Sequence, residues 1–379
     1  MLKNLLITLI SAMLFLLLHG FVSAQSSAEQ QSSGKKSQES QILMPEVFEL
    51  ANIAFALTDF SQSNENMTEK TGDYYERVTG HFAPHKDHDL IKKLDALVKK
   101  NYMAYVANRG YAVNFVFEGD KLKPANIYPP ERKFQLIVVG DAFNDLSLWE
   151  DFAKKSDFRR FYAENKQFYS QTLARAAKNL PIGKIWAWLE REFPARFDRY
   201  WIYVSPLIGG THSTFSSSFN NLNQCFMFVS DASRYDTKRF TAKQIEGLYT
   251  GIVFTEIDHN YNNPISARYE QQIQEAMPDL SKWSSGAEAG GGNYRSALKI
   301  FDEYATHSLY LLYIRDNFAP ADYEVIKQNR IALMTKRRGF TKFEEFHNEF
   351  LRLYETKKQS EKISDIYPLL ILWLSTQNK

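Results

Sequence analysis

Apolar residues in the first half of the chain recur mostly at helical spacing, interrupted by short runs rich in Val, Ile and Phe. Pro45 stands where the first turn of a helix tolerates proline, and apolar residues three and four positions apart follow it up to Leu57, which predicts a first helix. Further helical segments are predicted at 89–105 and 149–193, the second broken at Pro181 and Gly183, and strands at 112–118 and 134–140. This half is expected to be a mixed α/β region.

The second half begins with two strand-like runs and continues almost entirely in helical patterns. A polar stretch rich in Ser and Asn, 209–223, is expected to form a loop between buried strands at 200–204 and 224–230. Periodicity predicts helices at 243–261, 294–318 and 323–359, a glycine-containing loop at 281–293, and an apolar core segment at 367–374. The patterns together predict an α+β fold, with a mixed α/β N-terminal region at 42–199 and a helix-rich region at 200–379.

The segment 1–41 is expected to lie outside this fold. Lys3 precedes an apolar run, and the small residues that end at Ala24 complete the pattern of a secretory signal peptide, 1–24. The apolar run is shorter than the roughly 20 residues that span a bilayer. Residues 25–41, which are rich in Ser, Gln, Glu and Lys, are expected to be a disordered tether. The sequence therefore predicts a protein exported to the periplasm or the medium, with no membrane span.

The composition of the chain limits which partners and which metal-binding groups are expected. The chain carries 46 Lys and Arg against 44 Asp and Glu, a formal net charge of +2, so no basic excess favours a nucleic acid. Cys225 is the single cysteine, which excludes an intramolecular disulfide and zinc clusters built from cysteines. Histidines and carboxylates are then the available metal ligands. The sequence does not specify an oligomeric state.

The candidate chemistry lies in the predicted helix that contains Glu256 and His259. These residues are three apart and share a helix face, from which Asp258 is turned away. The zinc motif His-Glu-x-x-His uses two histidines as ligands and its glutamate as general base toward the metal-bound water. Thr255, whose hydroxyl is a poor zinc ligand, stands at the first histidine position. The alternative interpretation is a polar helix face with a hydrogen-bonded histidine.

A second pair, again a glutamate and a histidine, follows on a later predicted helix. Glu303 and His307 are four apart and also share one helix face. Two helices can therefore converge on a metal ion. The alternative is that Glu303 and His307 pair with each other across one helical turn.

The segments 254–264, 205–212 and 301–313 together resemble a domain-of-unknown-function family of exported bacterial proteins that is similar to zinc metallopeptidases of the gluzincin type. The resemblance covers most of the chain after the tether. It implies a zincin-like metallopeptidase fold, with Glu256 as general base and with His259 and Glu303 as zinc ligands. Asn263 and Pro264 follow the motif as in members that resemble active peptidases, whereas Thr255 departs from it.

The resemblance also implies a role for the segment 206–215, which precedes the motif helix. In zincins an edge strand at this place pairs with extended substrate, and Gly209 and Gly210 permit a close approach of backbone. We expect this segment to form the rim of an open cleft that Glu256 faces. His212 is expected near that cleft, where it polarises a carbonyl or completes a coordination sphere; the alternative is a solvated histidine.

Three hypotheses about function follow. The first is an exported zinc peptidase in which Glu256 takes the proton of metal-bound water. A zinc ion that activates water usually needs three protein ligands, so the predicted set is His259, Glu303 and His307, with His307 in the place left by Thr255. The second is an inactive metallopeptidase-like scaffold that binds a peptide or protein partner in the former cleft. The third is a site for another divalent ion, built from the same carboxylates and histidines.

Overall fold

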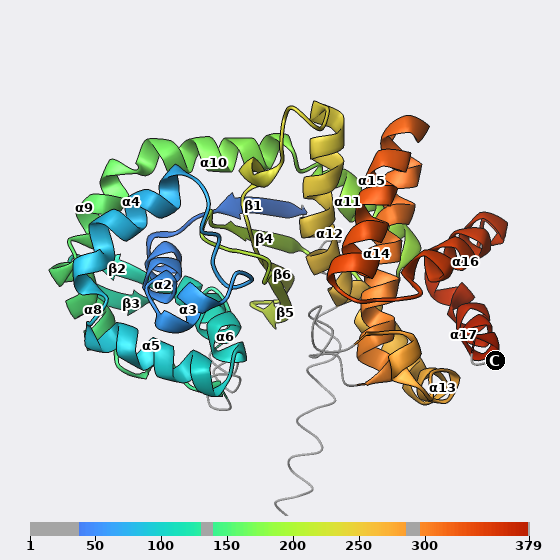
Figure 1. Ribbon diagram of the computed structural model, residues 1–379, viewed down its shortest axis with the longest axis horizontal. Coiled ribbons are helices and arrows are strands. Elements are labelled where there is room, and N and C mark those ends of the chain that lie inside the picture. Colours follow the sequence, from blue (N-terminus) through green and yellow to red (C-terminus); the bar gives the residue numbers. More distant parts are fainter. Residues whose placement is uncertain (1–37, 130–138, 286–295, 378–379) are drawn as a thin grey trace, which may run out of the picture. The chain divides into compact units, whose positions relative to one another are not determined.

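The structure is a computed structural model that describes residues 38–129, 139–285 and 296–377. The chain divides into two units, Met1–Gln38 and Glu39–Lys379, and the second contains the elements given below. Its larger sheet has the strand order β1-β4-β6-β5, with β1 at Glu39–Leu43, β4 at Arg199–Val204, β6 at Leu222–Val229 and β5 at Ser213–Phe219 (Figure 1). β1, β4 and β6 run parallel, whereas β5 pairs antiparallel with β6 and ends the sheet.

The N-terminal part surrounds its own hydrophobic core with helices and a small hairpin. Its elements are α2 (Glu46–Ala56), α3 (Asp59–Ser63), α4 (Asp73–Phe82), α5 (Asp89–Lys100), α6 (Met103–Tyr111), β2 (Phe115–Glu118), β3 (Lys121–Pro124), α8 (Leu146–Lys155), α9 (Phe158–Glu164), α10 (Lys166–Lys178) and α11 (Ile182–Glu192). β2 and β3 form an antiparallel pair. Trp149 of α8, Phe158 of α9 and Phe55 of α2 are all fully buried in this core.

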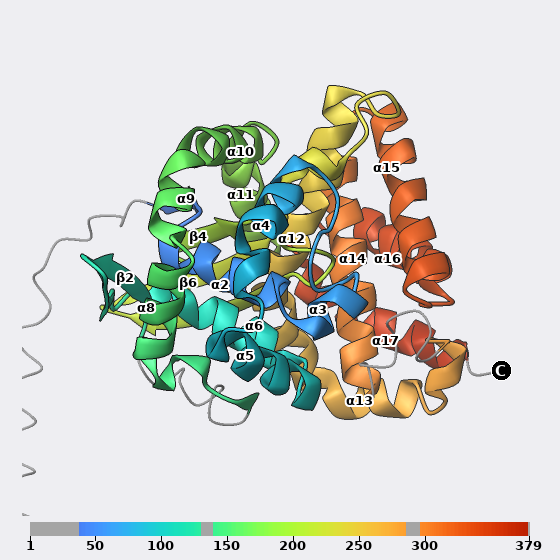
Figure 2. The same cartoon turned by 60° about the vertical axis from the view of Figure 1, so that its left-hand side comes forward.

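The C-terminal part is built from longer helices. Its elements are α12 (Ala242–Ser266), α13 (Glu270–Ala276), α14 (Ala297–Asn317), α15 (Pro320–Ala332), α16 (Phe343–Thr356) and α17 (Tyr367–Thr376). A π-helical turn, Leu333–Arg337, follows α15. α12 and α14 lie side by side in the views of Figures 1 and 2, and α14 is buried along most of its length.

Helices cover both faces of the larger sheet, which explains why its central strands are almost continuously apolar. Ile202 of β4 and Met227 of β6 belong to the hydrophobic core that also contains α12. Tyr203 is one residue out of phase and faces the other side, where its ring centroid lies 5.6 Å from that of Phe48 on α2. Figure 1 shows α2 and α12 on the two sides of the strands. The sheet thus supports α12 from one side.

The architecture agrees with several predictions made from the sequence. The described chain mixes α and β structure, and helices dominate its C-terminal half. The predicted first helix corresponds to α2, and the predicted buried strands correspond to β4 and β6. The motif helix is α12, and it continues beyond the predicted end at 261, through Pro264, to Ser266. Among the described residues, no helix is both long enough and apolar enough to cross a bilayer.

Other predicted boundaries of helices, strands and loops differ from those of the structure. The stretch 209–223 is not only a loop, because it contains the strand β5. Residues 39–41, assigned to the tether, belong to β1 and pair with β4. The domain boundary at 199/200 falls inside β4 and within one compact unit. The segment 89–105 is divided between α5 and α6, and 112–114 is a 3₁₀ turn rather than strand.

Some predictions concern residues outside the described ranges. These are the signal peptide, most of the tether and nearly all of the predicted strand at 134–140.

Candidate functional site

Helix α12 carries the residues of the incomplete zinc motif. Thr255 is only 6% exposed, and its hydroxyl donates to the backbone carbonyls of Gly251 at 3.0 Å and Ile252 at 3.2 Å. Both acceptors belong to the preceding turn of the same helix, so the hydroxyl is directed along the helix. Glu256 and His259, by contrast, are both partly exposed. Thr255 is therefore not presented as a metal ligand, as its chemistry predicts.

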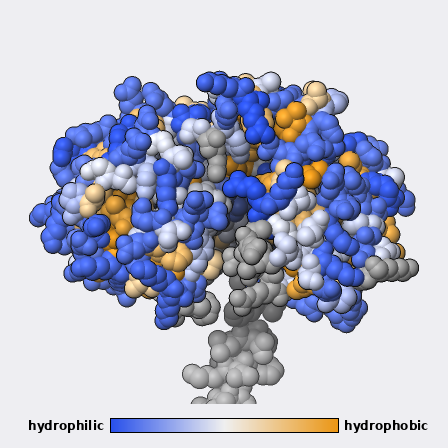
Figure 3. Space-filling model, in the orientation of Figure 1, coloured by the Kyte–Doolittle hydropathy of each residue, from blue (hydrophilic) through white to orange (hydrophobic). Residues whose placement is uncertain are grey.

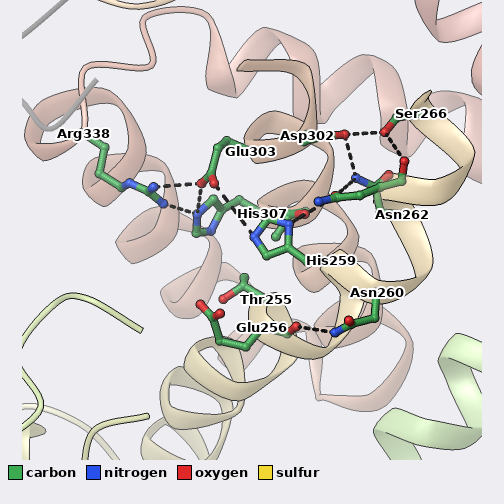
Figure 4. A network of polar contacts seen from close by, with 12 residues as sticks. Thr255, Glu256, His259, Asn260, Asn262, Ser266, Asp302, Glu303, His307 and Arg338 are labelled. Atoms are coloured by element: carbon green, nitrogen blue, oxygen red, sulfur yellow. Dashed lines mark hydrogen bonds and ion pairs between the residues drawn. The ribbon is translucent and has the colours of Figure 1, made fainter. Parts of the chain in front are cut away.

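Glu256 carries the carboxyl group on this face with the fewest partners. Within the described residues its carboxyl oxygens make no hydrogen bond or ion pair, and the dashed line at Glu256 in Figure 4 leads only from its backbone carbonyl to Asn260. Loss of hydration raises the pKa of Glu256 to about 7, although the charge of the neighbouring His259 opposes this shift. The negative charge of Glu303 adds to the increase. Glu256 thus exchanges a proton near neutral pH.

Glu303, on α14, lies at the centre of the polar cluster shown in Figure 4. Its Oε2 accepts a hydrogen bond from Nη2 of Arg338 at 2.8 Å and lies 3.5 Å from Nε2 of His307. Its Oε1 lies 3.9 Å from Nε2 of His259 on α12. Burial alone raises the pKa of Glu303, but the Arg338 guanidinium and the two imidazoles hold it well below its usual range. Glu303 is therefore an ionised carboxylate that joins the two helices.

His307 is enclosed by two arginines that the sequence pattern did not indicate. Nη1 of Arg330 lies 2.7 Å from its Nδ1, and Nη1 of Arg338 is in close contact with its Nε2. Burial lowers the pKa of His307 to about 3, and the charges of both guanidinium groups contribute to this decrease while Glu303 opposes it. His307 is therefore a neutral imidazole at physiological pH.

These contacts test whether zinc fits the predicted ligands. Of the residues expected to cluster, namely Glu256, His259, Glu303 and His307, both histidines lie within 3.9 Å of the Glu303 carboxylate. However, a guanidinium group faces each ring nitrogen of His307, and Arg338 also binds Glu303. Among the described residues no three His, Cys, Asp or Glu side chains are arranged to hold a metal ion. The predicted set therefore does not fit zinc here, because three available ligands are required.

His259 is oriented by polar neighbours on both helices. Its Nδ1 lies 3.3 Å from Oδ1 of Asn263, one turn later on α12, and 3.3 Å from Oγ1 of Thr306 on α14. These contacts direct Nε2 toward Glu303. The side chain of Asn263 therefore helps to orient the imidazole ring of His259.

A second polar group joins the ends of α12 and α14 next to this cluster (Figure 4). Asp302 accepts hydrogen bonds from Ser266 and from Nδ2 of Asn262, the latter at 3.3 Å, and the hydroxyl of Tyr367 donates to Asn262. Burial raises the pKa of Asp302 to about 6. Asp258, turned away from Glu256 as predicted, is fully buried, and loss of hydration raises its pKa well above its usual range.

The strand β5 lies directly beside the face of α12 that carries Glu256. Nδ2 of Asn260 donates to Oγ1 of Thr214 at 2.8 Å, which ties the helix to this terminal strand. Arg109 of α6 is fully buried and donates through Nη2 to Oγ of Ser213 at 2.9 Å and to the carbonyl of Thr211 at 3.2 Å. The start of β5 is thus held between two helices. Of the segment 206–215, residues 213–215 belong to the strand β5, which precedes α12 in the chain.

The predicted roles of the glycines and of His212 need correction. A Cβ atom on Gly209 would lie 2.8 Å from the carbonyl oxygen of Asn66, and one on Gly210 would lie 2.8 Å from Oδ1 of Asn66. The close approach that requires glycine is therefore to another part of this chain. Nε2 of His212 lies 3.1 Å from Oγ of Ser230, just after β6, so the partly exposed imidazole is hydrogen-bonded within the chain.

Three arginines of the site, Arg109, Arg330 and Arg338, were missed from the sequence. Arginines follow no spacing rule that separates a buried position from an exposed one. One indirect signal existed for Arg330. Gly251 stands inside a long helix without a local reason for glycine, and a Cβ atom there would collide with the side chain of Arg330.

Comparison of the chain with models of protein families, with curated proteins and with solved structures found no match.

Proposed function

We propose that this protein is a metallopeptidase-like, zincin-type scaffold that binds an extended peptide beside β5 without using a catalytic zinc ion. The observation that carries the proposal is the position of Arg338, which binds Glu303 and contacts His307 where zinc would need both as ligands. A peptidase that has lost its metal retains its peptide-binding surface. The exposed face of α12 and the adjoining terminal strand are that surface.

The sheet supports this proposal through the place of β5. Extended peptides can bind beside a strand and an adjoining helix, where pockets for their side chains give specificity. Within the described residues, β5 is the last strand next to β6. The bond between Asn260 and Thr214 places it against α12, so a peptide along β5 passes the partly exposed face that carries Glu256.

Glu256 supplies a polar anchor for such a peptide. Its carboxyl group lacks a partner among the described residues, so it is available to accept an N–H of the peptide. Above pH 7, where Glu256 is ionised, a hydrogen bond to this charged group contributes about 1.5–3 kcal/mol, which corresponds to a tenfold or larger change in affinity. Glu256→Ala is therefore expected to weaken peptide binding at least about tenfold. Glu324→Ala, which removes a more exposed carboxylate on α15, is the matched control.

The test is amide hydrogen exchange on the mature chain with a synthetic peptide that has been selected from a random display library. Protection is expected over β5 and not over β1, the opposite end of the same sheet. Equal protection of both strands, or protection confined to other elements, would show that the peptide does not bind beside β5. Failure to select any peptide would count against the proposal as a whole.

A hydrolase is the second candidate, and one observation favours it. A general base works best when its pKa is close to the working pH, and the pKa of Glu256 is raised to about 7. Cleavage of a quenched fluorescent peptide library by the parent and by Glu256→Gln separates the candidates. Binding without cleavage supports the scaffold, whereas cleavage that disappears in Glu256→Gln supports the hydrolase.

We also propose that the protein is exported after cleavage behind Ala24, which rests on the composition of 1–24. The mass of the chain recovered from the cell envelope or the medium should then correspond to residues 25–379.

A further inference from the structure

We infer that the peptide bound at this site is acidic, and that a basic segment of the chain, 325–343, attracts its carboxylates and holds them beside Arg338. The inference rests on the proposed function, because it names the chemical class of the peptide. A scaffold of the proposed kind accepts neutral and basic peptides equally well unless its charges select against them. A neutral peptide that binds beside β5 would therefore refute the inference and leave the proposed function intact.

The basic segment concentrates charge of one sign. Between residues 325 and 343 there are six lysines and arginines and no aspartate or glutamate, whereas the whole chain carries 46 basic and 44 acidic residues. The six are Lys327, Arg330, Lys336, Arg337, Arg338 and Lys342. Like charges gathered on a short segment produce a local positive potential that the balanced composition of the chain does not reveal.

Part of this charge is buried without a carboxylate of its own. Arg330 is only 8% exposed, and its guanidinium lies 2.7 Å from Nδ1 of His307 and 4.3 Å from the centroid of the Tyr310 ring. Within the described residues it forms no ion pair. Arg338 pairs with Glu303 at 2.8 Å, so among these residues two guanidinium groups share one carboxylate. An uncompensated buried charge is costly, and a carboxylate of a ligand would offset it.

Glu256 does not cancel this excess, because another arginine balances it. Loss of hydration raises the pKa of Glu256, and the charge of Arg109 is among those that oppose the shift. Arg109 is fully buried, and in the described part of the chain it donates to hydroxyl and carbonyl groups but to no carboxylate. Arg109 and Glu256 together are therefore close to neutral. The excess positive charge lies on the side of the basic segment.

Lys336 and Arg337 extend this charge from the edge of the site to the surface. Both side chains are exposed, and neither forms an ion pair with a described residue. They end the π-helical turn that follows α15. Just beyond them, the carbonyl of Gly339 accepts a hydrogen bond of 2.8 Å from the N–H of Ser285, which fixes the backbone of the segment. The positive groups are thus carried by an ordered part of the chain before a ligand binds.

The basic segment meets the proposed path of the peptide at His259. Arg338 lies at the edge of the cluster in Figure 4, with a side chain 28% exposed, and binds Oε2 of Glu303. Oε1 of the same carboxylate lies 3.9 Å from His259, which shares the partly exposed face of α12 with Glu256. A peptide anchored at Glu256 through a backbone N–H can therefore direct an acidic side chain toward the basic segment, where charge-assisted hydrogen bonds would hold it.

The experiment compares charged and uncharged versions of one peptide. A random peptide display library is selected on the mature chain at about 150 mM salt, and the tightest binder is also synthesised with Asn for each Asp and Gln for each Glu. Fluorescence anisotropy then gives the affinities of both versions for three proteins. These are the parent, Lys336→Gln with Arg337→Gln, and the control Lys154→Gln with Lys178→Gln, which removes the same charge from exposed positions on α8 and α10.

Selected peptides should be enriched in Asp and Glu, and the neutral version should bind the parent at least about tenfold more weakly. Lys336→Gln with Arg337→Gln should weaken binding of the acidic version about threefold to tenfold, because exposed charge pairs contribute modestly. The same variant should bind the neutral version as the parent does. The control should bind both versions as the parent does.

Several results would overturn the inference. They are selected peptides without an excess of Asp and Glu, a neutral version that binds as tightly as the acidic one, and a control that weakens binding as much as Lys336→Gln with Arg337→Gln. Heparin that displaces the acidic peptide and binds more tightly would show that the basic segment recognises polyanions in general, which also contradicts it. If no peptide is selected at all, the inference and the proposed function are both wrong.

Discussion

Gly251 lies one helical turn before Thr255, where α12 passes the side chains of Arg330 and Tyr310. A Cβ atom at this position would lie 2.6 Å from Cζ of the buried Tyr310 ring and would also collide with Arg330. Overpacking of this kind costs about 1–3 kcal/mol, against the roughly 1 kcal/mol that alanine gains over glycine in a helix. Gly251→Ala should therefore lower the free energy of unfolding by up to about 2 kcal/mol in urea titrations.

Gly80 provides the control for this prediction. It is exposed on α4, and a Cβ atom there would meet no atom within 4 Å. Gly80→Ala should therefore leave stability unchanged or raise it by about 0.5–1 kcal/mol. Equal effects of the two substitutions would show that the close contact between α12 and Arg330 is absent.

Glu49 on α2 makes stability depend on pH at a place remote from the site. Its side chain is fully buried, and Tyr74 donates a hydrogen bond of 2.7 Å to its Oε1. Burial raises the pKa of Glu49 from 4.5 to about 7. The folded state therefore binds the proton more tightly than the unfolded state. This contribution is fully present below pH 4.5 and is lost as pH rises through 7.

Urea titrations at two pH values test this dependence. Between pH 5 and pH 8 the parent should lose roughly 2–3 kcal/mol of unfolding free energy relative to Glu49→Gln, because glutamine cannot ionise. Glu324→Gln, which changes an exposed carboxyl group, should follow the parent. The same slope in the parent and Glu49→Gln would assign the pH dependence to other groups.

At the scale of elements, the sequence predicted the helices and strands that are buried enough to carry a complete pattern of apolar residues. α2, β4 and α12 each present enough large apolar residues to be recognised. β5 does not, since its sequence Ser-Thr-Phe-Ser-Ser-Ser-Phe carries only two large apolar side chains. A strand at the end of a sheet has fewer buried neighbours than a central one, so its sequence can remain polar. Its pairing with β6 is a tertiary contact that local composition does not specify.

In the candidate site, too, the sequence predicted the features that depend on local spacing and missed those that depend on tertiary packing. Spacing on a helix predicted that Glu256 shares a face with His259, and that Glu303 shares one with His307. In the structure His259 and His307 both lie next to the carboxylate of Glu303. Arg330 and Arg338 follow His307 by 23 and 31 residues, so only the packing of α15 and of the chain after it against α14 brings them to His307. Whether the site holds a metal therefore depended on residues outside the motif.

At the scale of the whole molecule, the strand β1 shows that the fold begins earlier than composition suggested. Residues Glu39–Leu43 pair in parallel with β4, although 39–41 were assigned to a tether. β4 is a central strand only because β1 covers its free edge. Arg199 of β4 also forms an ion pair of 3.0 Å with Glu39. The segment before residue 200 and the helices after it are therefore parts of one sheet-centred unit.

Two truncations test where this unit begins. A chain that starts at Met44 lacks β1 and loses its backbone hydrogen bonds to β4, each worth about 0.5–1.5 kcal/mol, so it should lose roughly 3–5 kcal/mol of stability. A chain that starts at Gln38 keeps β1 and should melt, by circular dichroism, at the temperature of the chain that starts at Gln25. Indistinguishable melting of the Met44 chain would mean that β1 contributes little and that the fold begins at α2. A destabilised Gln38 chain would instead assign a structural role to the polar segment that precedes β1.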